Sequence, residues 1–108
     1  MSPFDLNAAV LSNIAAQGRD LTIVRFIDFE HLFQEREAAE TFAHQAASLG
    51  FQTKVRLYGD DENWNVTVSK NMVPSCEQIT AVEQQLDVLA HQYGGYADGW
   101  GFLSAPNE

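Results

Sequence analysis

Two similar segments follow each other along this chain, and each predicts a strand, an amphipathic helix and a second strand. In both segments the helix ends in glycine and an aromatic residue opens the next strand, as in Gly50-Phe51 and Gly95-Tyr96. The expected strands alternate between apolar and polar residues, and the expected helices repeat apolar residues at three- and four-residue steps. The elements are strand 21–33, helix 35–49, strand 51–58, strand 64–69, helix 75–93 and strand 96–103.

A further helix is expected before these two segments. Leu6, Val10 and Ile14 recur at four-residue steps, and Gly18 supplies a stop. A helix followed by βαββαβ predicts an α+β domain of ferredoxin-like arrangement, with a four-stranded antiparallel sheet and two helices on one face. At 108 residues we expect one domain. Its parts are an N-terminal helix (1–18), the ferredoxin-like region (19–103) and a short tail (104–108).

The charge balance limits the kinds of partner that we expect this chain to bind. Fifteen acidic residues against six basic ones give a net charge of −9, which repels nucleic acid and anionic membranes and attracts a basic protein. A single cysteine excludes an intramolecular disulfide and fits a reducing compartment. There is no signal peptide pattern and no apolar run of about 20 residues, the length that spans a bilayer. We therefore expect a cytoplasmic protein that makes no direct contact with nucleic acid or membrane.

Nothing in the sequence indicates catalysis, a metal or a cofactor. His31, His44 and His91 fall on three different elements without ligand spacing. We expect His44 and His91 at the surface, and His31 as a hydrogen-bonded histidine on the buried side of its strand. Cys76 follows the cap of the third helix, where a thiolate would gain from the helix dipole, but no histidine is placed as its base. A small residue in the first helical turn is the simpler interpretation.

The open face of the sheet, which the helices do not cover, is expected to be polar. A sheet of this topology that binds RNA carries aromatic residues for base stacking on its central strands, and here acidic, amide and hydroxyl residues occupy those positions. RNA binding by this face is therefore disfavoured. The residues expected there are Asp28, Glu30, Gln52, Lys54, Arg56, Tyr58, Asn65, Thr67 and Ser69.

The segment Tyr96-Ala97-Asp98-Gly99-Trp100-Gly101 is the most unusual stretch. Two glycines inside a strand indicate a bulge or a close backbone approach. Strict alternation would put Tyr96, Asp98, Trp100 and Phe102 on one side of the sheet. The aromatic residues would then either join the core or form an apolar edge that a helix, a second copy or a partner covers. The first is favoured for Trp100, because large apolar patches seldom stay exposed.

In this segment, in the strand Arg25–Phe33 and in the helix through Ala39-Glu40-Thr41-Phe42-Ala43 into Leu49-Gly50-Phe51, the chain resembles the regulator of ribonuclease E activity B (RraB) family. The resemblance implies a ferredoxin-like domain without enzymatic activity. It also implies binding to ribonuclease E, an endonuclease with a basic scaffold region, and restraint of RNA decay. The −9 charge suits such a partner.

The first hypothesis is therefore a cytoplasmic protein-binding regulator that inhibits a ribonuclease and needs no cofactor. A small-ligand-binding or enzymatic ferredoxin-like dimer, with a pocket near His31, Tyr58 or Trp100, is the second hypothesis. An immunity or antitoxin-like protein is the third. A homodimer is left open. The expected partner-binding residues are Asp28, Glu30, Tyr96, Asp98 and Trp100.

Overall fold

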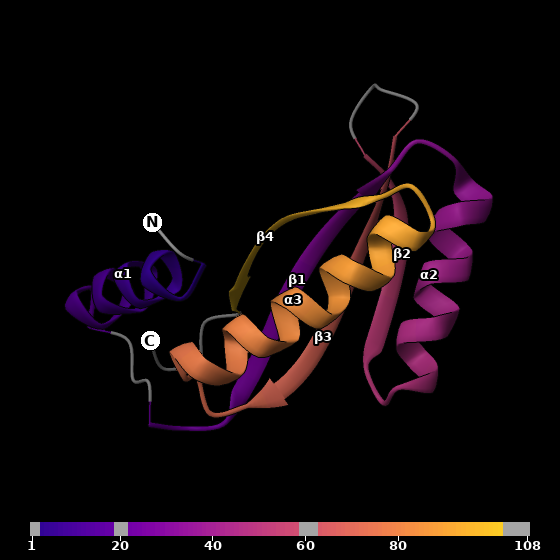
Figure 1. Ribbon diagram of the computed structural model, residues 1–108. Helices are drawn as coiled ribbons and strands as arrows, with labels where there is room; N and C mark the ends of the chain where they lie inside the picture. The colour runs from indigo at the N-terminus through magenta and orange to yellow at the C-terminus, as the bar shows by residue number, and fades with distance from the viewer. Residues whose placement is uncertain (1–2, 19–21, 59–62, 103–108) are drawn as a thin grey trace.

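The computed structural model describes residues 3–18, 22–58 and 63–102, and the predicted tail lies outside these residues. Three helices and four strands follow in the predicted order (Figure 1). The second and third helices begin within one residue of their predicted starts. The elements are α1 (Pro3–Ala16), β1 (Arg25–Phe33), α2 (Arg36–Ser48), β2 (Gln52–Tyr58), β3 (Asn63–Met72), α3 (Cys76–Gln92) and β4 (Tyr96–Phe102).

The four strands form one antiparallel sheet in the order β2-β3-β1-β4. This confirms the prediction of an α+β domain with a four-stranded antiparallel sheet. β1 and β3 are the central strands, and they pair without interruption from Arg25 opposite Met72 to Phe33 opposite Trp64. β2 and β4 form the two edges, so the unusual glycine-rich segment is an edge strand.

Both α2 and α3 lie on the same face of the sheet, where they enclose a single apolar core. Alternate residues of β1 point into this core, and the intervening residues point to the open face. α3 starts where predicted, because the Ser75 hydroxyl accepts a hydrogen bond from the Gln78 backbone N–H at 3.1 Å. The largest fully buried side chains are Phe29, Phe33, Phe42, Ile27, Ile79, Leu86, His31, Val66 and Val68.

α1 packs on α3, away from α2 (Figure 1). Its contact centres on Asn7, which is only 4% exposed. The Asn7 amide nitrogen donates to Thr80 Oγ1 at 2.9 Å and to Glu83 Oε1 at 3.0 Å, and its amide oxygen accepts from the Trp100 indole N–H at 2.8 Å. One side chain therefore joins α1 to both α3 and β4. The Cys76 thiol adds a bond to the Phe4 carbonyl at 3.0 Å.

A bulge interrupts β4, as its glycines predicted. Phe29 pairs with Trp100 and His31 pairs with Ala97, so Asp98 and Gly99 together stand opposite a single residue of β1. Gly99 has a φ of +107°, a backbone conformation that residues with a Cβ rarely adopt. The extra residue reverses the alternation beyond it. The expectation that Tyr96, Asp98 and Trp100 share one side is therefore wrong: Tyr96 lies on the open face and Trp100 on the helix side.

We expect Asn7→Ala to lower the free energy of unfolding by roughly 2 kcal/mol, since three hydrogen bonds are lost, one of them to a carboxylate. The matched control is Asn13→Ala, which changes an exposed asparagine of the same helix. Urea denaturation of the full chain measures both. Equal unfolding midpoints for the two variants would contradict the role assigned to Asn7.

Candidate functional site

The open face of the sheet carries the candidate site. The pairing of β1, β3 and β2 places its side chains in three rows across the strands. As predicted, this face is mostly polar. Phe26, 36% exposed, Leu32, 8% exposed, and Tyr96, 53% exposed, are the apolar and aromatic additions to it. The rows are Asp28-Ser69-Gln52, Glu30-Thr67-Lys54 and Leu32-Asn65-Arg56.

Two carboxylates in the middle of this face are held by hydroxyl groups of β3. The Ser69 hydroxyl donates to Asp28 Oδ1 at 2.6 Å, and the Thr67 hydroxyl donates to Glu30 Oε2 at 2.8 Å. All four side chains are half-buried. Such charge-assisted bonds are short and strong, so they fix the direction of each carboxylate before any partner arrives. A carboxylate can accept more than one hydrogen bond, so the Asp28 and Glu30 carboxylates can each accept a further hydrogen bond from a partner.

Asn65 organises the third row. Its side chain is buried beneath the open face and accepts a hydrogen bond from Arg56 Nε at 3.3 Å. Its amide nitrogen reaches the His31 carbonyl at 3.5 Å. The Thr67 hydroxyl also lies 3.1 Å from Asn65 Oδ1. Asn65 therefore links the Arg56 guanidinium on β2 to the central strands by hydrogen bonds.

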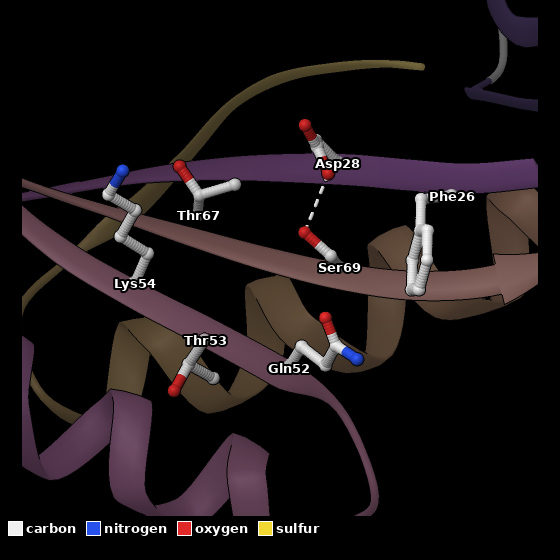
Figure 2. Close-up of a pocket in the computed structure, with 7 residues that line it drawn as sticks. All are labelled: Phe26, Asp28, Gln52, Thr53, Lys54, Thr67 and Ser69. Atoms are coloured by element: carbon white, nitrogen blue, oxygen red, sulfur yellow. Dashed lines mark hydrogen bonds between the residues drawn. The ribbon is translucent and has the colours of Figure 1, made fainter. Parts of the chain in front are cut away.

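A shallow hollow of about 390 Å³ lies on the open face over Asp28, Ser69 and Lys54. Figure 2 shows Asp28, Thr67 and Lys54 rising on the same side of three neighbouring strands, with Ser69 bonded to Asp28. The hollow brings together one carboxylate, one ammonium group, one amide and three hydroxyls, a polar set suited to contact with another polar surface. Its lining residues are Phe26, Asp28, Gln52, Thr53, Lys54, Thr67 and Ser69.

The structure brings together three of the five predicted partner-binding residues. Asp28, Glu30 and Tyr96 share the open face, and Asp98 is exposed in the bulge at its edge. Trp100 is the exception, because it pairs with Phe29, packs against the core and bonds to Asn7. Lys54 and Arg56 lie on this face as expected from the sequence, but they were not among the predicted site residues. The pairing register, which places them across β3 from the acidic residues, could not be read from the strand patterns alone.

His31 is buried as predicted, but within the described part of the chain one of its two ring nitrogens lacks the hydrogen bond that a hydrogen-bonded core histidine would make. It is 1% exposed, its ring centre lies 4.8 Å from that of Phe42, and its Nδ1 has no hydrogen-bond partner among the described residues. Burial lowers the pKa of His31, against smaller opposing effects from backbone groups and from Asp87 and Glu30. A neutral core residue is the role that fits this geometry.

The other candidate ligands and nucleophiles do not assemble into a site. His44 and His91 are exposed, as predicted, and Cys76 is the first residue of α3. Among the described residues, no three His, Cys, Asp or Glu side chains are grouped to hold a metal ion. A second hollow of about 240 Å³ lies between the start of α2 and the end of α3, and His31 and Trp100 line neither hollow. No helix within residues 3–18, 22–58 and 63–102 is long and apolar enough to cross a membrane.

Comparison with protein families decides the family. The family model described as Regulator of ribonuclease activity B (RraB) matches residues 4–102. The chain belongs to the RraB family. The match runs from α1 to the end of β4, so it includes the buried Asn7, the open face and the bulge. RraB proteins regulate ribonuclease activity, which confirms the regulatory class expected from the sequence. A search of curated proteins gave no match.

The lowered pKa of His31 predicts that the folded state is most stable when this side chain is neutral. Below its ordinary pKa of 6.5 the unfolded chain takes up a proton that the folded chain takes up only at lower pH. His31 therefore lowers stability progressively as the pH falls below 6.5 and through its folded-state pKa. We expect His31→Phe to lose less stability than the wild type between pH 7.5 and pH 5, measured by urea denaturation.

The exposed His44→Gln serves as the control for this pH series, and it should follow the wild type. An equal loss of stability in all three proteins would show that His31 does not contribute to the pH dependence.

Proposed function

We propose that this RraB-family chain is a non-enzymatic regulator that binds a ribonuclease of the ribonuclease E type through the open face of its sheet. By this binding it would inhibit the enzyme and slow RNA decay. The observation that carries the proposal is the pair Asp28 and Glu30, whose carboxylates are half-buried and oriented by Ser69 and Thr67 in the middle of a face that no described helix covers.

Oriented carboxylates suit a basic protein partner for two reasons. Their side chains are already held in place by hydroxyl groups, so binding costs less conformational entropy than it would for free surface side chains. In addition, the net charge of −9 accelerates the approach of a basic scaffold region and makes binding sensitive to salt.

The other predicted site residues have two roles in this proposal. Tyr96 and Asp98 extend the contact surface toward the β4 edge, where both are exposed. Trp100 acts indirectly: its bond to Asn7 holds β4 in place against α1, so it positions Tyr96 rather than touching the partner.

Three finer assignments accompany the proposal. We assign the βαββαβ region to the ferredoxin-like arrangement, with α1 as an added helix on α3. We place the protein in the cytoplasm, where its single free cysteine is compatible with a reducing environment. The open face is also the surface on which two copies of the chain could meet as a homodimer.

We expect Asp28→Asn/Glu30→Gln to weaken binding to a basic ribonuclease E scaffold fragment by roughly tenfold or more at low salt, because two oriented charges are lost from the contact. Wild-type affinity should fall steeply as salt rises. Fluorescence anisotropy with a labelled fragment measures both effects.

The matched control is Glu37→Gln/Glu77→Gln, which makes the same change in net charge on exposed positions of α2 and α3. It should bind nearly as well as the wild type. No wild-type binding at low salt, or the same loss in both double variants, would overturn the proposal.

A further inference from the structure

The charges of the open face are sorted into two columns. β1 carries Asp28 and Glu30, and β2 carries Lys54 and Arg56. Between them lie the uncharged side chains of β3, so that Thr67 pairs with Glu30 on one side and with Lys54 on the other. Neighbouring strands are about 4.8 Å apart, which separates the acidic and basic columns by roughly 10 Å.

At this separation the two columns do not neutralise each other directly. No ion pair joins Asp28 or Glu30 to Lys54 or Arg56 in the described structure; the hydroxyls of β3 bond to the carboxylates, and Asn65 accepts from Arg56. The spacer column thus keeps the half-buried carboxylates apart from the exposed basic side chains, and both columns remain able to pair with a partner. Two of the six basic residues of a strongly acidic chain lie in this arrangement.

We propose that the segment which binds the open face is an α-helix with two charged flanks, basic over β1 and acidic over β2. This inference rests on the proposed function and specifies the chemistry of its partner. A purely basic segment would meet Asp28 and Glu30 favourably but would place its remaining cations against Lys54 and Arg56, which is repulsive. A two-flanked helix matches both columns.

The dimensions fit a helix that lies along β3. Asp28 and Glu30 are two residues apart on one strand, as are Lys54 and Arg56 on another, a spacing of about 6.7 Å along the sheet. Helix positions i and i+4 are about 6 Å apart along the axis, and a helix with its side chains is roughly 10 Å wide. Charges at four-residue steps on opposite flanks of one helix would therefore lie over the two columns together.

The test uses the full chain and three alanine-rich helical peptides of equal length. The first carries lysines at four-residue steps on one flank and glutamates on the opposite flank. The second has the same composition with the charges mixed on both flanks, and the third carries lysines alone. Fluorescence anisotropy at low salt should give at least tenfold tighter binding for the first peptide than for the second.

The charge reversal Lys54→Glu/Arg56→Glu separates this inference from the proposed function, because the two predict opposite signs for its effect. It should weaken the binding of the two-flanked peptide and of the ribonuclease E scaffold fragment at least tenfold. It should strengthen the binding of the lysine-only peptide. The control Arg36→Glu/Lys70→Glu makes the same change in net charge away from this face, where Arg36 lies over Trp64 and Lys70 over Phe51. It should leave the preference for the two-flanked peptide unchanged.

Three results would overturn the inference. Equal binding of the first two peptides is one. The second is tighter scaffold binding by Lys54→Glu/Arg56→Glu while Asp28→Asn/Glu30→Gln still weakens it; the proposed function would then stand with a purely basic contact. The third is a wild-type dimer in sedimentation that the charge reversal dissociates, which would assign the face to a second copy of the chain. No effect of either face variant on scaffold binding would remove the proposed function itself.

Discussion

The pairing of β1 with β3 is the constraint on which both the core and the open face depend. One side of β1 supplies Ile27, Phe29 and His31 to the core, and the other presents Asp28 and Glu30. Because strand side chains alternate, a slip of one residue would put carboxylates into the core and aromatic rings on the surface. The cost of such an exchange fixes the register. The same register sets the hydroxyls of β3 beside the carboxylates, so the site is a consequence of the core.

The β4 edge depends on a second constraint, the meeting of a bulge with a buried polar contact. Gly99 allows the extra residue, and the resulting reversal turns Trp100 toward α1 while Tyr96 stays on the open face. Burying an indole N–H is unfavourable without an acceptor, and the Asn7 amide supplies one. A helix outside the βαββαβ region is thereby tied to the strand that borders the candidate site. The unusual glycine-rich segment thus forms an edge of the sheet and also connects the sheet to α1.

The order of elements and the polar character of the open face could be predicted from the sequence, since strand alternation and helical spacing are local signals. The orientation of Trp100 could not, because glycines indicate a bulge without saying which residue is the extra one. Asn7 gave no signal either: its partners Thr80, Glu83 and Trp100 lie more than 70 positions away. Contacts between distant positions also explain why Lys54 and Arg56 could be predicted as open-face residues but not as a column parallel to Asp28 and Glu30. Pairing across strands decides such arrangements, and local patterns do not contain it.

Net charge and charge arrangement have different consequences for a regulator of this family. The excess of nine negative charges acts at a distance, where it raises the rate of encounter with any basic protein, whatever its shape. Discrimination among basic proteins needs contacts that penalise the wrong one. A wholly acidic face would lack such contacts, whereas Lys54 and Arg56, across β3 from Asp28 and Glu30, repel a surface that carries cations everywhere. In the proposed complex, the two basic residues would therefore limit the affinity that the chain's acidity otherwise gives, and that limit would make the face selective.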